Sequence, residues 1–294
     1  MKKFYQSSLI VAAIAIFGLA IQTQATIVTQ SLWSMGEPGS LGGTGNLYAL
    51  DTVISDGALN NMNNIFSGVS YLSATPPPFT GSSTYLHLAP VSSLSGEWMF
   101  NPSGTGQPAT TAQTLPSDNY GFEVWVRATA NVSNFAPVMF IGDGVGGLQL
   151  DQTSGSDGQH WAAVRDGQAW LVSAPFTPGA PGTELTLSTW YDLALVRDNG
   201  VTKMFVNGVQ VGSGDATAPS NSGFVGFGIQ PRTGGFNFAG DIDEARVFTF
   251  SAGQFTTSDL YINNLLVPEP STAALVGVSG LMILGLRRRS KNTV

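Results

Sequence analysis

The sequence predicts an all-β protein with one sandwich or barrel domain, and three observations support this prediction. Apolar and polar residues alternate over short stretches, turn-forming residues interrupt these stretches at close intervals, and no amphipathic pattern exceeds two helical turns. The 36 glycines among 294 residues suit a chain with many tight turns. The chain has no cysteine, which excludes disulfides and thiolate metal sites. A domain of roughly 245 residues buries enough core to be stable without them.

The amino terminus has the three parts of a secretory signal peptide. Lys2-Lys3 supply positive charge, residues 9–21 form an apolar stretch, and Thr23-Gln24-Ala25 resembles a cleavage site. We therefore expect residues 1–25 to form a signal helix that is removed after Ala25. The alternative is an uncleaved amino-terminal anchor.

Strands are expected mainly in the second half of the chain, where short apolar stretches end at Gly, Asn or Asp. In the first of these, alternation places Phe122, Val124 and Val126 on one face of a sheet. Asp166-Gly167 and Asn207-Gly208 are typical of hairpin turns. Residues 252–266 are expected to form a short helical turn at the edge of the sandwich. The expected strands are 122–127, 138–141, 161–164, 169–172, 190–197, 202–206, 209–211, 224–229 and 236–250.

The carboxyl terminus has the features of a sorting signal. Pro268, Glu269 and Pro270 can continue neither a strand nor a helix, so the folded body is expected to end there. As a helix, the uncharged residues 271–286 would span roughly 24 Å, slightly less than the ~30 Å hydrocarbon core of a bilayer. The cluster of Arg287, Arg288 and Arg289 would hold the end of this helix on the cytoplasmic side.

This order of features resembles the PEP-CTERM sorting signal of exported bacterial proteins. The resemblance implies a transmembrane helix in residues 267–294, an exosortase-type processing enzyme as a partner, and an inner-membrane intermediate before delivery to the cell surface or extracellular matrix. An ordinary carboxyl-terminal membrane anchor is the alternative. The folded domain is then residues 26–266.

Without the two terminal signals the chain is strongly acidic. All 19 Asp and Glu residues lie between Glu37 and Glu269, whereas six of the 12 Lys and Arg residues lie in the terminal signals. The mature chain therefore carries a net charge of −13 with neutral histidines. Such a surface repels nucleic acid and anionic lipid and attracts cations such as calcium, so a nucleic-acid partner is excluded.

Three motifs of the second half resemble the laminin G-like, concanavalin A-like jelly roll. The resemblance covers about residues 120–260, with Leu32 to Glu37 and Asp51 similar to the first strand and the acidic loop of such domains. It implies a concanavalin A-like jelly-roll β-sandwich of two antiparallel sheets with roughly a dozen strands. The motifs are Asn119-Tyr120-Gly121-Phe122-Glu123-Val124-Trp125-Val126, the hairpin from Trp190 to Asp198 with Phe205-Val206-Asn207-Gly208, and the strand from Phe238 to Phe248.

The acidic part of the last motif departs from the pattern of glucanases that share this fold. Those enzymes carry Glu-x-Asp-x-(x)-Glu on one strand, and Asp241 and Asp243 would share a face in the same way. Here an aspartate replaces the first glutamate, and Ala245 and Arg246 stand where the second is needed, so the acid–base pair is incomplete. We therefore expect no catalytic residues and no enzymatic activity.

Calcium is the cofactor that the acidic residues favour, since this cation takes several carboxylate and carbonyl oxygens. By position in laminin G-like domains, Asp51 and Asp243 are the candidate metal ligands, with Asp143 and Asp151 as alternatives in loops. The competing interpretation of Asp243 is a structural ion pair with a nearby arginine, such as Arg246 or Arg197.

Other chemistry-bearing residues are interpreted as structural. His87 and His160 have neighbours that do not suggest a metal site, and the glycine-rich residues 142–147 are expected to be a turn. Sugars stack on exposed aromatic rings, and Trp125, Trp161, Trp170 and Trp190 are the available ones, although most strand tryptophans in a sandwich belong to the core.

The sequence therefore predicts an exported, non-enzymatic surface or matrix protein that binds glycan or protein in exopolysaccharide. The first alternative is a divergent carbohydrate-active enzyme on the same fold. The second is a purely structural surface protein.

Overall fold

The structure is a computed structural model of the whole chain, and the parts of the chain that it describes begin at the first strand of the domain. The predicted signal segments 1–25 and 267–294 lie outside them. The described residues are 27–35, 63–64, 69–73, 84–89, 97–98, 115–131, 136–141, 146–152, 159–165, 184–214, 225–228 and 238–264.

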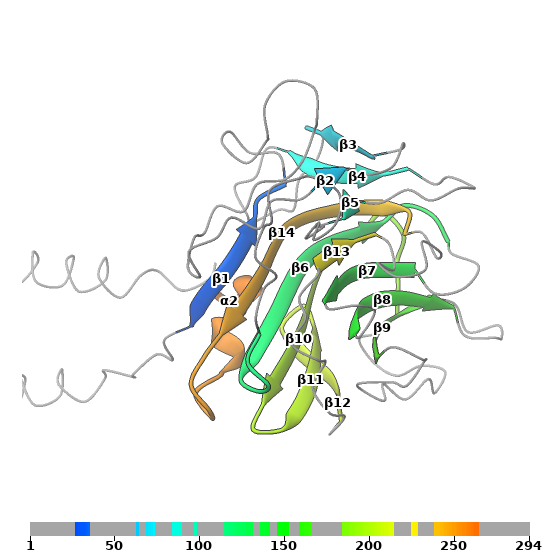
Figure 1. Cartoon of the computed structure of the whole chain (residues 1–294). Coiled ribbons are helices and arrows are strands. Elements are labelled where there is room, and N and C mark those ends of the chain that lie inside the picture. Colours follow the sequence, from blue (N-terminus) through cyan, green and yellow to red (C-terminus); the bar gives the residue numbers. More distant parts are fainter. Residues whose placement is uncertain are drawn as a thin grey trace, which may run out of the picture.

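The larger of two antiparallel sheets has eight strands and contains the long strands of the molecule (Figure 1). In spatial order it runs β12, β11, β10, β6, β14, β4 and β3, and β1 also pairs with β14. The bounds are β1 Val28–Trp33, β3 Val69–Leu72, β4 Tyr85–Leu88, β6 Tyr120–Ala128, β10 Tyr191–Asp198, β11 Val201–Val206, β12 Val209–Gly214 and β14 Gly240–Thr249.

The smaller sheet has six strands in the order β2, β5, β13, β7, β8 and β9, and all of its pairings are antiparallel. The two sheets confirm the predicted all-β sandwich. The bounds are β2 Asn63–Asn64, β5 Glu97–Trp98, β7 Ala136–Ile141, β8 Gly146–Gln152, β9 Gln159–Arg165 and β13 Val225–Phe227.

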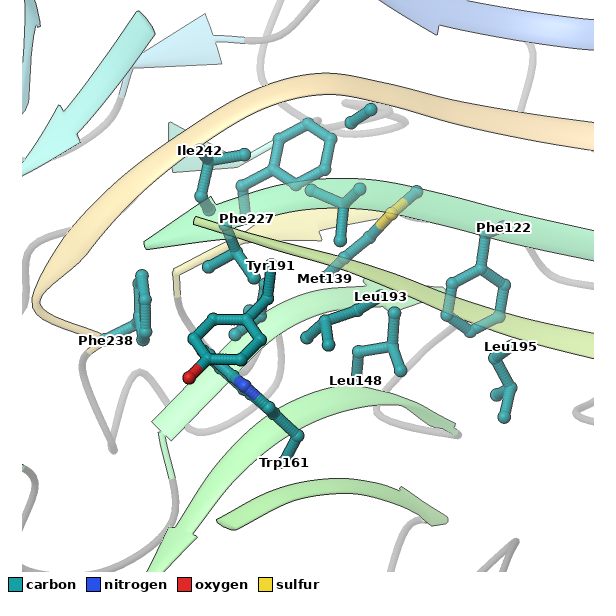
Figure 2. Close-up of a cluster of buried hydrophobic side chains, with 14 of the residues drawn as sticks. Phe122, Met139, Leu148, Trp161, Tyr191, Leu193, Leu195, Phe227, Phe238 and Ile242 are labelled. Carbon is teal, nitrogen blue, oxygen red and sulfur yellow. The ribbon is translucent and has the colours of Figure 1, made fainter. Parts of the chain in front are cut away.

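The main core lies between the sheets and is filled by alternate residues of their strands. Phe122, Val124 and Val126 of β6 all belong to it, as the alternation predicts. Leu193 and Leu195 of β10 join them from the next strand, to which β6 is paired. Figure 2 shows Phe122, Leu193 and Leu195 facing residues of the smaller sheet, which include Met139, Leu148, Trp161 and Phe227.

A second apolar cluster covers the opposite face of the larger sheet. The chain after β14 forms a 3-10 turn, η2 Thr257–Asp259, and a short helix, α2 Tyr261–Asn264. Leu260 is fully buried there, and Phe255 and Ile262 pack beside it. The predicted helical turn therefore exists, but it packs across this face of the sheet. The sheet residues of the cluster are Ala194, Val196, Phe205, Phe248 and Phe250.

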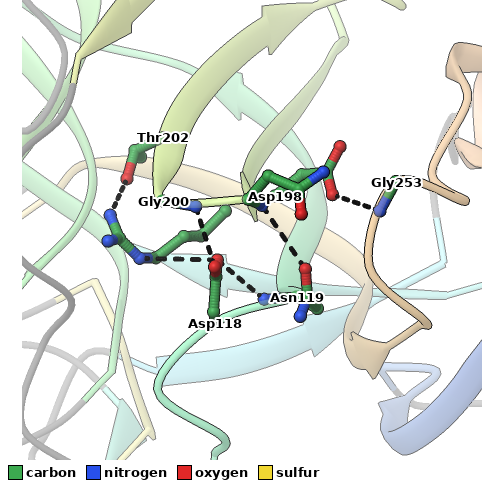
Figure 3. A network of polar contacts seen from close by, with 8 residues as sticks. Asp118, Asn119, Asp198, Gly200, Thr202 and Gly253 are labelled. Atoms are coloured by element: carbon green, nitrogen blue, oxygen red, sulfur yellow. Dashed lines mark hydrogen bonds and ion pairs between the residues drawn. The ribbon is translucent and has the colours of Figure 1, made fainter.

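Two Asn-Gly turns join β10, β11 and β12, and the second of them, Asn207-Gly208, is the turn that the sequence predicts. Asn199 and Gly200 have φ angles of 51° and 77°, and Asn207 and Gly208 have 50° and 75°. Positive φ at both positions is the geometry of the type I′ hairpin turn. The first turn is held by Asp118, whose Oδ2 accepts a hydrogen bond of 2.8 Å from the backbone N–H of Gly200 (Figure 3).

A β-bulge in β14 changes which residues face the core. Glu244 has a φ of 43°, and the register between β14 and β6 shifts between Asp243 and Arg246. Ile242 and Ala245 therefore both face the core, although they are three positions apart, which is an odd number. Arg246 consequently lies on the same face as Asp243.

No helix among the described residues has the length and apolarity needed to cross a membrane. The two helices expected at the chain ends fall on residues outside the described ranges. The hairpin expected around Asp166-Gly167 also falls there, although its first strand is present as β9.

Candidate functional site

The face of the larger sheet that points away from the main core carries most of the buried charged residues. We call it the outer face, and it is defined by Glu123, Trp125 and Arg127, which alternate with the core residues of β6. At the end of the sheet near Arg127 the outer face is polar and aromatic. At the opposite end it carries the second apolar cluster.

Polar side chains line up across neighbouring strands at the polar end. Arg127 of β6 is paired with Asp241 of β14, Asp241 with His87 of β4, and His87 with Ser70 of β3. Trp190, which immediately precedes β10, lies on the other side of Arg127. We call this set of five side chains the cross-strand row. Residues in such a row have Cβ atoms about 4.5–5.5 Å apart, so their side chains interact.

Asp241 is the buried centre of the cross-strand row, with 1% of its side chain exposed. Its Oδ2 accepts a hydrogen bond of 2.7 Å from Nε of Arg127, and its Oδ1 lies 2.6 Å from Nδ1 of His87. A carboxylate only accepts, so the proton of the second bond resides on Nδ1. Nε2 of His87 makes no hydrogen bond with any described residue and is the ring atom left for a ligand.

Arg127 is fixed by aromatic rings as well as by Asp241. Its guanidinium carbon lies 5.2 Å from the ring centroid of Tyr85 and 4.9 Å from that of Trp190. The two rings meet edge to face, with centroids 5.7 Å apart. Cation–π contacts of this kind contribute about 0.5–2 kcal/mol. Trp190 is therefore held in one orientation while remaining half-buried.

The exposed parts of the row combine a polar and an aromatic side chain. The side chain of His87 is 25% exposed and offers a polar nitrogen, and Trp190 offers an apolar ring. Ligand sites in proteins generally pair apolar or aromatic surface with a few fixed polar groups. The buried Asp241 and the part-buried Arg127 therefore fix the positions of both residues.

The next positions along the outer face are more deeply buried. Trp125 is paired with Asp192 on one side and Asp243 on the other, and all three are at most 1% exposed. One step further, Glu123 faces Arg246, whose Nε donates a hydrogen bond of 2.7 Å to Oε2 of Glu123. These buried groups lie between the cross-strand row and the second apolar cluster.

The alternation of Asp241 and Asp243 on one face is confirmed, but their surroundings differ. Asp243 is fully buried beside Trp125, and its Oδ1 accepts a hydrogen bond of 2.9 Å from the backbone N–H of Glu244 at the bulge. Arg246 pairs with Glu123, and Arg197 lies 3.6 Å from a carboxylate oxygen of Asp118.

The predicted calcium ligands are only partly within the described ranges. Asp51 and Asp143 lie outside them, and Asp151 lies in β8, opposite His160 of β9. Within the described residues no three His, Asp or Glu side chains gather in a way that would hold a metal ion. A calcium site built on Asp51 and Asp243 stays a prediction.

The tryptophans separate into core residues and one candidate ligand residue. Trp161 is fully buried in the main core, and Trp125 is buried on the outer face. Trp190 is half-buried in the cross-strand row, and Trp170 lies outside the described residues. His87 is hydrogen-bonded, as its structural interpretation predicts, and His160 is buried in the smaller sheet.

The participation of Tyr85 and Arg127 was not predicted from the sequence. The alternation Tyr85-Leu86-His87-Leu88 does indicate that Tyr85 and His87 share a face. It does not indicate that β4 pairs with β14, since more than 150 residues separate His87 from Asp241 along the chain. The row is visible only once the strand order is known.

The fold agrees with a match to a family of known proteins. Residues 102–254, just over half the chain, match the family model described as the concanavalin A-like lectin/glucanases superfamily. No curated protein matches the sequence.

Several solved structures are similar to this chain at low identity. Domain 4 of AbnA, a GH43 extracellular arabinanase from Geobacillus stearothermophilus solved with arabinotriose, is 16% identical with a TM-score of 0.46, over 70% of this chain and 87% of that one. Trypanosoma rangeli sialidase is 16% identical with a TM-score of 0.47, over 80% of this chain but only 32% of the sialidase. The binding domain of botulinum neurotoxin serotype D is 12% identical with a TM-score of 0.46, over 81% and 50% of the two chains.

Proposed function

The chain belongs to the concanavalin A-like lectin/glucanase superfamily, and on this basis we propose that it is a non-enzymatic binding module for glycan at the cell surface or in the extracellular matrix. The observation that carries the proposal is the cross-strand row, in which the buried Asp241 and the part-buried Arg127 hold the part-exposed His87 and Trp190. A sugar ring would stack on Trp190, and a hydroxyl would bond to Nε2 of His87.

Export is part of the proposal, and features at both ends of the sequence support it. The charged amino terminus with its apolar stretch, and the Pro268-Glu269-Pro270 tail with its arginine cluster, are together the features of a protein sent through the membrane and processed by an exosortase-type enzyme. The −13 charge of the mature body disfavours nucleic acid as a partner.

The absence of activity is proposed from the acidic residues of the outer face. Asp241, where related glucanases carry a carboxylate of their motif, is already bonded to Arg127 and His87. Asp243 is fully buried and accepts a backbone hydrogen bond. A glycosidase needs one carboxyl group that gives a proton and another that attacks or activates water, both open to the substrate.

A glycan array combined with a reducing-sugar assay tests the proposal. The protein is expected to bind a subset of glycans without releasing sugar. Trp190→Ala and His87→Ala should each weaken binding about tenfold, which corresponds to about 1.4 kcal/mol for one lost contact. Val209→Ala, at a side chain that is 65% exposed on β12, is the matched surface control and should bind normally.

Other results would favour the alternatives. Release of reducing sugar that Asp241→Asn abolishes would establish a divergent glycoside hydrolase. Binding to no glycan would leave a structural surface protein. Binding that survives both row variants would place the site elsewhere on the domain.

A further inference from the structure

Residues 255–264, which include η2 and α2, cover the outer face at the end opposite the cross-strand row. Their apolar side chains Phe255, Leu260 and Ile262 pack on the second apolar cluster. They are also held by polar contacts to three different strands. We call residues 255–264 the latch segment, because they are the last described part of the chain before the proposed sorting signal.

Two buried carboxylates hold the backbone of the latch segment. The N–H of Tyr261 donates a hydrogen bond of 2.7 Å to Oε1 of Glu123, and the N–H of Ile262 donates one of 3.3 Å to Oδ2 of Asp192. Both carboxylates are fully buried, on β6 and β10. The latch segment is therefore attached to the sheet through acceptors that water does not reach.

A single arginine accompanies the two carboxylates. Arg246, only 4% exposed, donates to Glu123 and also gives a 2.6 Å hydrogen bond from Nη2 to the backbone carbonyl of Asp259. Its guanidinium carbon lies 3.8 Å from the ring centroid of Tyr261. With both carboxylates ionised, the buried group would hold two negative charges and one positive charge. An uncompensated buried charge is strongly destabilising.

The pKa values of the buried groups indicate how this excess negative charge is avoided. Burial, and next the neighbouring Glu123 carboxylate, raise the pKa of Asp192 well above its ordinary value. A side-chain hydrogen bond between Asp192 and Glu123 contributes to the same rise. Burial also raises the pKa of Tyr261, so its phenol stays neutral. The other ionisable groups of the packed elements are Glu244 and Arg246 on β14 and Asp259 in η2, whose carboxylate accepts from the N–H of Thr256.

We propose that the latch segment is a proton-dependent latch, closed while Asp192 is protonated beside the Glu123 carboxylate and loosened when that proton is lost. Two carboxylates that share one guanidinium carry no excess charge as long as one of them is protonated. Loss of the proton at higher pH places two negative charges side by side in a dry site. Release of residues 255–264 lets water reach both.

Opening of the latch has a defined structural result. The ten residues 255–264 would lengthen the connection to the carboxyl-terminal tail by up to roughly 33 Å. Phe205, Phe248 and Phe250 would lose their cover. The pH would then determine how far the carboxyl-terminal tail extends from the folded body.

Hydrogen exchange on the full chain between pH 5 and pH 9 tests this proposal. The protection factors of the Tyr261 and Ile262 amides should fall with rising pH, by up to about tenfold per unit for one linked proton, after correction for the intrinsic rate. Amides of β6 should keep their protection over the same range. Asp192→Asn, which is neutral and of equal size, should abolish the fall.

Two further variants keep the test decisive. Glu123→Gln removes the other acid and should also abolish the fall, so it serves if Asp192→Asn does not fold. Asp118→Asn, at a carboxylate just before β6 with 31% of its side chain exposed, is the control and should retain the wild-type fall. Protection in the wild type that does not change with pH would overturn the proposal. A fall that persists in both variants would also overturn it.

Discussion

The guanidinium of Arg246 on β14 and the carboxylate of Glu123 on β6 form an ion pair in which the two side chains are 5% and 0% exposed. The pair exists because the bulge at Glu244 turns Arg246 away from the core. Without the extra residue, Arg246 would alternate to the face occupied by Ala245 and Val247. The bulge thus determines that Arg246 and Glu123 meet on the outer face.

Replacement of Arg246 should destabilise the domain strongly. Arg246→Met keeps much of the side-chain volume but leaves the buried Glu123 carboxylate without its cation, and we expect the free energy of unfolding to fall by about 3–5 kcal/mol. Urea denaturation measures this value. The double variant with Glu123→Gln should recover part of the loss, because it removes the unpaired charge. A loss below about 1 kcal/mol in the single variant would contradict the role of the pair.

Truncation of Leu195 tests the assignment of the core face. This side chain is 4% exposed within the main core, so Leu195→Ala should cost about 2–5 kcal/mol of unfolding free energy. Val209→Ala on the exposed side of β12 should change stability by less than about 0.5 kcal/mol. Similar losses for the two variants in denaturant melts would show that this face is not the core.

Stability should depend on pH through Asp192. Its pKa is raised in the folded state, so the folded protein keeps a proton that the unfolded chain loses above about pH 4. The Asp192 contribution to the unfolding free energy therefore falls as pH rises from about 4 through the folded pKa, by at most about 1.4 kcal/mol per unit. Melts of wild type and Asp192→Asn measure it, and the variant should gain relative stability as pH rises. A difference that does not change with pH would disprove this.

Calcium should stabilise the domain if the acidic body holds a site. Millimolar calcium on a site of roughly 10 μM affinity would add about 2.7 kcal/mol, and Asp243→Asn should remove most of this gain. Asp157→Asn is the control and should keep it. Magnesium should substitute poorly because it prefers a smaller octahedral shell. Equal melting temperatures with calcium and with chelator would rule the site out.

Removal of both terminal signals should give a mature protein that is shorter at both ends. Intact-mass analysis of material from the cell surface should show an amino terminus near Thr26 and a carboxyl terminus near Pro270, with neither hydrophobic segment present. Recovery of a chain that still carries Arg287 to Val294 would contradict the sorting signal and favour a permanent membrane anchor.

The strands and turns of the second half could be predicted from the sequence because their signals are local. Val124 and Leu195 face the core as their alternation predicts, and Asn207-Gly208 forms the predicted turn. The candidate site is not local. His87, Arg127 and Asp241 meet only through the order of β4, β14 and β6.

The burial of Asp192 also could not be predicted from sequence patterns. In Trp190-Tyr191-Asp192-Leu193 the aspartate lies on the face opposite the core, and this position predicts a side chain exposed to solvent. Residues 255–264 return across that face and bury it, and this packing depends on Leu260, about 70 positions later in the chain. The bulge at Glu244 could not be predicted either, because the sequence has no Gly or Pro at this position.

Ile27 and Ile262 both pack against the second apolar cluster, so the first and last described parts of the chain meet at one end of the larger sheet. For a protein attached by its carboxyl terminus, tension would enter the fold at Asn264. The load would reach the hydrogen bonds of Ile262 and Tyr261 before it reaches the long ladder between β1 and β14. Under such a load, release of residues 255–264 would come before separation of β1 from β14.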